Sequence, residues 1–177
     1  MNIVNDKPVD ELVNGIVVAG MAKQRGVQQL KTIDPAKLDE LEKAMFELVE
    51  SGVLKEISPV TTHTFTPNTY VREGKMFAGS VYLGHSHKTI HHCIVISGRM
   101  SLLNADRTTT EIVAPCVFLG SPGRKAVFIH EDVIMQNIHD TRDLPREVLC
   151  EERIEELEDL LYSKTDAYRE HQRKLLK

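Results

Sequence analysis

From residue 79 to residue 98 the chain reads GSVYLGHSHKTIHHCIVISG. Four of its eight histidines fall within eight positions of this stretch, at His85, His87, His91 and His92. Successive side chains of a β-strand alternate between its two faces, so His85 and His87 are expected on the same face. Two imidazoles close together on a buried face are poor core material but good ligands for a divalent transition metal. This stretch is therefore the part of the sequence that indicates a functional site.

The spacing of glycines and histidines in this stretch forms a longer pattern. Five residues separate Gly79 from His85, three separate His87 from His91, and six separate His91 from Gly98. The pattern resembles the first signature of the cupin superfamily, G(x)5HxH(x)3–4E(x)6G, with His91 where the family usually has Glu. The resemblance covers about half of the chain and implies an antiparallel β-barrel of jelly-roll type with a metal held inside it.

The resemblance implies that His85, His87 and His91 are the metal ligands. His92 is an alternative to His91, because the family tolerates three or four intervening residues, but the distance to Gly98 favours His91. Three imidazoles would leave coordination positions open for water or substrate. They carry no charge, so a bound divalent ion would be a stronger Lewis acid than in a carboxylate-ligated site. One divalent transition metal is expected, and Fe, Zn, Ni and Mn all remain open.

The second cupin signature is only half present. Pro122-Gly123 matches its proline turn, but its histidine ligand would fall at Ala126 or Val127, which cannot bind a metal. Either three histidines hold the ion or a fourth ligand comes from elsewhere. Further candidates for the site are His139 and Gln136 as ligands, His63 as a pocket residue, and Tyr70 and Arg72 as residues that orient an anionic substrate.

The chain divides into three segments by composition. Residues 1–56 are predicted to be an N-terminal helical arm, in which Asp34-Pro35 begins a helix and Gly52 ends it. Residues 57–143 are predicted to be the cupin β-barrel, and residues 144–177 a charged helix from Glu147 to about Lys174. Both helical segments either cover the barrel or pair with a second subunit.

The middle segment contains short runs rich in β-branched and aromatic residues, separated by turn residues, which is typical of an all-β sandwich or barrel. Turns are expected at Ser97-Gly98 and at Glu131-Asp132, among others. The expected strands are Val60–Phe65, Thr69–Arg72, Lys75–Tyr82, Ile90–Ile96, Met100–Leu103, Thr109–Val113, Cys116–Leu119, Lys125–Ile129 and Val133–His139.

Composition excludes several classes of function. The 177 residues are 41% hydrophobic and 27% charged, which is an ordinary globular profile, and the net charge of −4 offers no basic field for nucleic acid. No apolar run approaches the roughly 20 residues that span a bilayer. Three cysteines without metal-type spacing indicate reduced thiols, and with no secretory signal they favour a cytoplasmic protein.

Two classes of function follow. The first is a metal-dependent enzyme, oxygenase- or lyase-like, that acts on a small molecule. The second is a non-catalytic structural or interaction module that forms a homo-oligomer, most simply a dimer, through its helices. The second rests on a further resemblance, to uncharacterised short cupin proteins of tailed bacteriophages, which would place the protein in the host cytoplasm. That likeness is carried by Gly84-His85-Ser-His87-Lys88, Ser97-Gly98-Arg99, Pro122-Gly123, Glu131-Asp132 and Asn137-Ile-His139.

Overall fold

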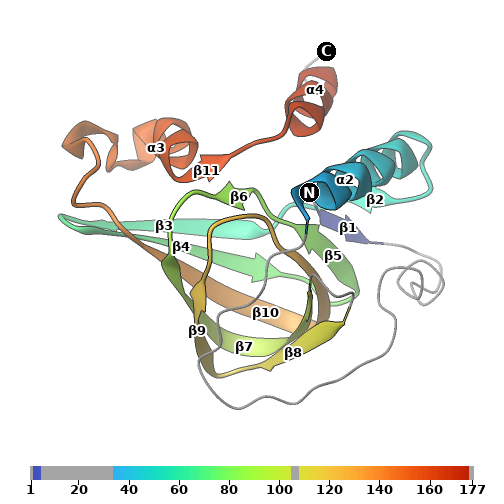
Figure 1. Cartoon of the computed structure of the whole chain (residues 1–177), viewed down its shortest axis with the longest axis horizontal. Helices are drawn as coiled ribbons and strands as arrows, with labels where there is room; N and C mark the ends of the chain where they lie inside the picture. The colour runs from blue at the N-terminus through green and yellow to red at the C-terminus, as the bar shows by residue number, and fades with distance from the viewer. Residues whose placement is uncertain (1, 5–33, 105–107, 176–177) are drawn as a thin grey trace.

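The structure is a computed structural model that describes residues 2–4, 34–104 and 108–175. The centre of the fold is a pair of long antiparallel strands, β7 (His91–Leu103) and β10 (Ala126–Asp140). The outer edge of β10 pairs with two strands in succession, and so does the outer edge of β7 (Figure 1). The remaining strands extend the sheet from these neighbours. They are β1 (Asn2–Val4), β2 (Lys55–Glu56), β3 (Val60–Thr66), β4 (Thr69–Met76), β5 (Ser80–Leu83), β8 (Thr109–Val113) and β9 (Cys116–Gly120).

All pairings in this sheet are antiparallel, and helices flank it, so the predicted fold class is confirmed. The sheet curls, with β4 and β5 on one side of the central pair and β8 and β9 on the other (Figure 1). The hydrogen-bonded ladder does not close into a complete barrel among the residues that the structure describes.

Each of the two central strands, β7 and β10, is continuous where the sequence predicts two shorter strands with a turn between them. The turns expected at Ser97-Gly98 and Glu131-Asp132 are wrong, because both dipeptides lie inside a strand and face each other. Ser97 pairs with Ile134 and Arg99 with Glu131, so Asp132 and Val133 both stand opposite Gly98. Gly98 has a φ of +85°, and a Cβ there would overlap the backbone of Asp132. The result is a β-bulge, which bends the strand pair without ending it.

The inner face of the central pair changes character along its length. One half carries the apolar core, with Val95, Met100, Ile129 and Val133 fully buried. Alternation along the other half puts polar or ionisable side chains on the same face. These are His91, Cys93, Asn137 and His139, all buried.

The helix α2 (Pro35–Glu50) confirms the predicted start and stop. The Asp34 side chain accepts a hydrogen bond from the Ala36 backbone N–H, at 3.1 Å, and Gly52 follows the helix with a φ of +75°. Leu38, Met45 and Phe46 are buried against the end of the sheet.

The C-terminal segment is not the single helix that the sequence predicts. It contains 3-10 turns, a helix, a short strand and a second helix. The strand β11 (Tyr162–Ser163) pairs with β6 (Ser86–His87) and separates the two helices (Figure 1). The Tyr162 side chain is buried. The boundaries at residues 56/57 and 143/144 stay a prediction. The other elements are η1 (Arg146–Val148), η2 (Glu151–Arg153), α3 (Ile154–Leu161) and α4 (Asp166–Leu175).

None of the helices described here has both the length and the apolar character that crossing a bilayer would require.

Candidate metal site

Three histidines from three strands meet at the polar end of the central strand pair. His87 lies on β6, His91 begins β7, and His139 lies near the end of β10. One ring nitrogen from each lies within 4.8 Å of the others. His91 and His139 are buried, with 5% and 1% of their surface exposed, and His87 is partly buried. We refer to these three residues as the histidine group.

Hydrogen bonds fix two of the rings and leave one nitrogen of each available. His91 Nδ1 lies 3.1 Å from the Thr89 carbonyl oxygen, which only accepts, so the hydrogen is on Nδ1 and Nε2 keeps its lone pair. His139 Nε2 shares a hydrogen bond of 2.9 Å with the Tyr162 hydroxyl. The Nδ1 atoms of His139 and His87 are buried, with no hydrogen-bond partner among the described residues. In His139 the nitrogen without a partner is on a ring that a hydrogen bond to its other nitrogen orients, and such a nitrogen is suited to metal ligation.

Burial keeps the histidine group uncharged. It lowers the pKa of His139 to about 4, that of His91 below its ordinary value, and that of His87 well below it. In each case the main cause is the loss of hydration of the charged ring. Neutral imidazole is the form that binds a metal, so at neutral pH the group needs no proton release before it can bind one.

The three rings are stacked. The ring centroids of His87 and His91 are 3.9 Å apart with an interplanar angle of 10°, and those of His91 and His139 are 4.9 Å apart at 21°. Imidazole lone pairs lie in the ring plane, so nearly parallel rings do not all point at one place. Two nitrogens that share an ion at about 2.1 Å are at most about 4.2 Å apart. The chemistry and burial of the donors fit a metal, and rotation of the rings is needed to bring the donors onto it.

His85 lies apart from the histidine group, although the sequence predicts it as a ligand beside His87. Its ring packs edge-to-face against Tyr168, with centroids 4.6 Å apart, and burial lowers its pKa to about 3. The strand β5 ends at Leu83, and β6 begins only at Ser86. Because Gly84 and His85 are not in a regular strand, the alternation that would align His85 with His87 does not apply.

His91 and His92, the two alternatives for the third ligand, differ in burial. His91 is buried and belongs to the histidine group, whereas the side chain of His92 is exposed. Adjacent strand residues face opposite ways, so only one of the two can reach the inside.

Gln136, predicted as a possible ligand, and His63, predicted as a possible pocket residue, both lie outside the histidine group. Gln136 donates from Nε2 to Glu73 at 2.7 Å, on the face of β10 opposite His139. His63 Nδ1 is 2.8 Å from the hydroxyl of Tyr70 on the neighbouring strand. Neither residue lines the cavity described next.

The two residues predicted to orient a substrate differ in position. Tyr70 is completely buried and stacks on Phe65, so it is part of the core. Arg72 lines the cavity, and its Nε donates to Glu158 at 3.2 Å.

A cavity of about 410 Å³ adjoins the histidine group. His87 and His91 line it together with Cys93, Lys125 and Asn137, and apolar side chains form much of the remaining wall. Cys93 Sγ donates to Asn137 Oδ1 at 3.3 Å, and burial raises the pKa of the Cys93 thiol to about 12, which favours the protonated thiol at neutral pH.

Sequence reasoning missed four of the polar residues around this site. Cys93 and Asn137 could have been found, since each lies two residues from a histidine of the group and so faces the same way. Lys125 and Tyr162 gave no signal. Tyr162 lies in the segment predicted to be helical, and Lys125 comes just before β10.

The C-terminal segment covers one side of the cavity. Glu158, Tyr162 and Tyr168 from this segment line the cavity. Lys88 holds the segment close to β6, because its backbone N–H donates to the Leu161 carbonyl at 2.9 Å and its Nζ donates to the Asp159 carbonyl at 2.6 Å.

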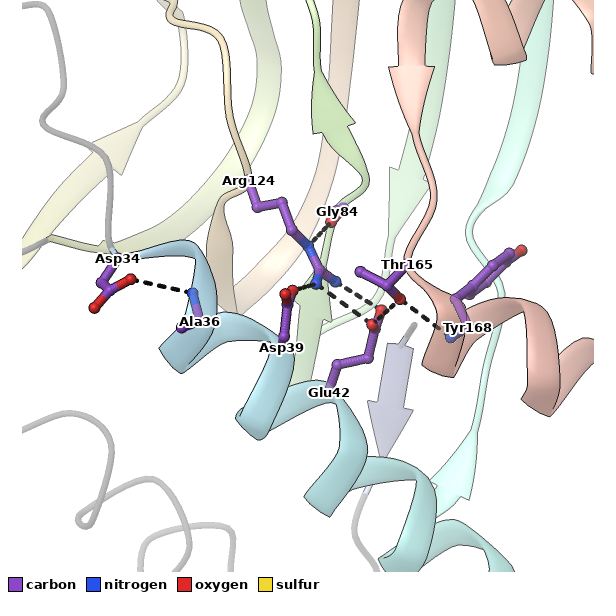
Figure 2. A network of polar contacts seen from close by, with 8 residues as sticks. All are labelled: Asp34, Ala36, Asp39, Glu42, Gly84, Arg124, Thr165 and Tyr168. Carbon is purple, nitrogen blue, oxygen red and sulfur yellow. Dashed lines mark hydrogen bonds and ion pairs between the residues drawn. The ribbon is translucent and has the colours of Figure 1, made fainter.

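A buried cluster of polar contacts joins α2 to this segment (Figure 2). Arg124 donates to Glu42 at 2.6 Å, to Asp39 at 2.7 Å and to the Gly84 carbonyl at 3.0 Å. The Thr165 hydroxyl donates to the Glu42 carboxylate and accepts from the Tyr168 backbone N–H. The side chains of Arg124 and Glu42 are 4% and 1% exposed. This Arg124–Glu42 cluster fixes α4 at the edge of the cavity.

Gly120 on β9 makes close contact with the histidine group. A Cβ at this position would overlap the imidazole of His91. Gly120→Ala is therefore expected to lower the free energy of unfolding by about 1–3 kcal/mol through overpacking, and to displace the His91 ring. Urea unfolding measures the first effect. Gly74→Ala is the matched control, because nothing lies within 4 Å of a Cβ there. Equal losses in the two variants would contradict the steric explanation.

No protein-family model matches the chain, and no curated protein matches it. Solved structures do resemble it. An RmlC-like cupin family protein with a double-stranded β-helix fold from Methanocaldococcus jannaschii is 13% identical, over 49% of this chain and 83% of that one, with a TM-score of 0.40. A cupin domain from Bordetella pertussis is 14% identical, over 49% and 96%, with a TM-score of 0.40. An acetylacetone dioxygenase from Acinetobacter johnsonii is 14% identical, over 48% and 61%, also with a TM-score of 0.40. These likenesses concern the fold alone.

Proposed function

We propose that this chain is a cupin-type metal protein in which His87, His91 and His139 hold one divalent transition metal, Fe, Zn, Ni or Mn. The observation that carries the proposal is that three uncharged rings, two of them buried and that of His87 partly buried, bring their nitrogens to within 4.8 Å of one another beside a cavity of about 410 Å³. Compared with the ligands inferred from the cupin motif, His139 takes the place of His85.

The reaction class that we propose is metal-dependent chemistry on a small molecule, oxygenase- or lyase-like. A bound ion would supply a Lewis acid and lower the pKa of a water molecule bound to it. The chain's own residues orient the donors: the Thr89 carbonyl holds the His91 ring, and the Tyr162 hydroxyl holds the His139 ring. The apolar and polar sides of the cavity would enclose a small substrate next to the ion.

Metal titration of the metal-free protein tests this proposal. We expect one equivalent of Zn²⁺, Fe²⁺, Ni²⁺ or Mn²⁺ to bind, and the affinity to fall by at least about tenfold in His91→Ala and in His139→Ala. His92→Ala is the matched control, because this exposed neighbour should change nothing. His85→Ala separates the two ligand sets, since only the set inferred from the motif requires His85. Calorimetry gives the stoichiometry, and circular dichroism checks that each variant is folded.

Wild-type protein that binds none of these ions would overturn the proposal. Loss of binding in His85→Ala with normal binding in His139→Ala would instead restore the ligand set inferred from the motif.

A second candidate function is a non-catalytic module that associates with itself, as in the phage-associated alternative. One observation favours it: Ile96, Val117 and Leu119 expose apolar side chains on the outer face of β7 and β9, with 46%, 53% and 36% of their surface accessible. The homo-oligomer and the cytoplasmic location stay predictions. Analytical sedimentation tests this alternative. If protein that binds one equivalent of metal sediments only as a monomer, the result would favour the enzyme.

A further inference from the structure

Lys125 brings a buried amino group to the cavity wall. Its Nζ is buried and has no hydrogen-bond partner among the described residues. A buried ammonium without a partner is costly, because the hydration that it loses is not replaced. His87 and His91 of the histidine group line the same cavity as Lys125, so the amino group faces the space beside the proposed metal site.

The cavity offers Lys125 no counter-charge of its own. Among its described lining residues the acids are Glu56 and Glu158. Glu158 accepts from Arg72 at 3.2 Å, and Glu56 is bound to the buried His171 at 2.8 Å. The histidine group is neutral, so a divalent ion there would add two further positive charges. An anionic ligand would supply the counter-charge that the described residues do not offer Lys125.

Much of the remaining wall is apolar. Met76, Met100, Met135, Leu102 and Phe118 all line the cavity. A ligand that fits the whole site therefore has an anionic end and an apolar body.

We propose that the cavity binds a small aliphatic carboxylate, with Lys125 Nζ donating to the carboxylate and the apolar body lying against the methionine side chains. This inference rests on the proposed function and names the substrate class of the same site. Lys125 is a binding residue in this arrangement, and no covalent step is required of it.

The methionines provide a local readout of binding. In protein labelled with ¹³C at the methionine methyl groups, hexanoate titrated into the metal-free protein should shift the signals of Met76, Met100 and Met135. Met45 is an internal control, since it packs in the core beneath α2 and does not line the cavity. Hexanamide has nearly the same shape without the charge, and should bind at least about tenfold more weakly.

Substitutions test the role of the amino group. Lys125→Met should weaken hexanoate binding by at least about tenfold, whereas Lys125→Arg, which keeps the charge, should retain most of it. Lys75→Met is the matched control, because Lys75 Nζ pairs with Asp132 on the surface. Removing an unpaired buried charge should not unfold the protein, and the hexanoate–hexanamide comparison needs no variant at all.

Hexanoate that binds no better than hexanamide, or equally well to Lys125→Met and wild type, would overturn the inference. Failure of the proposed function gives a different result. Lys125→Met should still bind one equivalent of metal if only the carboxylate inference is wrong, whereas neither this variant nor wild type should bind metal if the metal site is wrong.

Discussion

Arg124→Met is expected to lower the free energy of unfolding by about 3–5 kcal/mol. Removal of the guanidinium leaves the Glu42 carboxylate, 1% exposed, in the interior without its charged partner. It also removes the bond to the Gly84 carbonyl, which ties the cluster to the sheet (Figure 2). Breaking a buried pair from one side is far more damaging than replacing both partners, because one charge remains unpaired. Urea unfolding monitored by circular dichroism measures the loss.

The double variant Arg124→Met/Glu42→Leu provides the decisive comparison. It should be much closer to wild type than either single variant, since apolar side chains of similar size then fill the space. Asp39→Asn is the matched control. The side chain of Asp39 is 53% exposed, so its loss should cost less than about 1 kcal/mol despite its 2.7 Å contact with Arg124. Single and double variants with the same stability would mean that the pair contributes only through its packing.

Acidification is expected to destabilise the metal-free protein already at pH values above those at which carboxylates titrate. The buried histidines have a lowered pKa when folded, whereas the unfolded chain binds protons near pH 6.5. Stability is therefore complete above pH 6.5 and falls as the pH drops toward the folded pKa, which for His139 is about 4. That difference corresponds to on the order of 3 kcal/mol for His139 alone. His87 and His85 act in the same direction.

Unfolding free energies at pH 7, 5.5 and 4.5 test this expectation. His139→Gln should flatten the dependence, because a side chain that cannot titrate replaces one that is protonated only on unfolding. His92→Gln, at the exposed neighbour of His91, should leave the slope unchanged. A slope that is identical in wild type and His139→Gln would show that carboxylates alone account for the acid sensitivity. Bound metal should steepen the loss, since protons compete with it for the same nitrogens.

The sequence predicted the parts of the fold that depend on local chemistry. The cap at Asp34 and the bounds of β8 depend on residues that are neighbours in the chain, so the sequence signals them directly. The bulge could not be predicted, because Gly98 and Asp132 both carry ordinary turn signals and only their pairing across two strands turns them into one bend.

The candidate site was predictable to a similar extent. His91 follows from strand alternation and motif spacing. His85 was placed beside His87 by assuming a continuous strand, which the chain leaves at Gly84. His139 comes from a strand about 50 residues later, and only the pairing of β10 with β7 brings it to the group. Lys125 has no local signal, since a lysine before a strand is ordinarily exposed to solvent.

Because β6 pairs with β11, the arrangement of the histidine group depends both on the large sheet and on the C-terminal segment. Tyr162 packs edge-on against His87 and shares a hydrogen bond with His139, so these two rings have these contacts only while this segment is docked. Docking of the segment and occupancy of the site are therefore thermodynamically linked. Any ligand that prefers the docked form protects residues 162–175 from proteases, and cleavage there would release that ligand even though two of the three imidazoles belong to the long central strands.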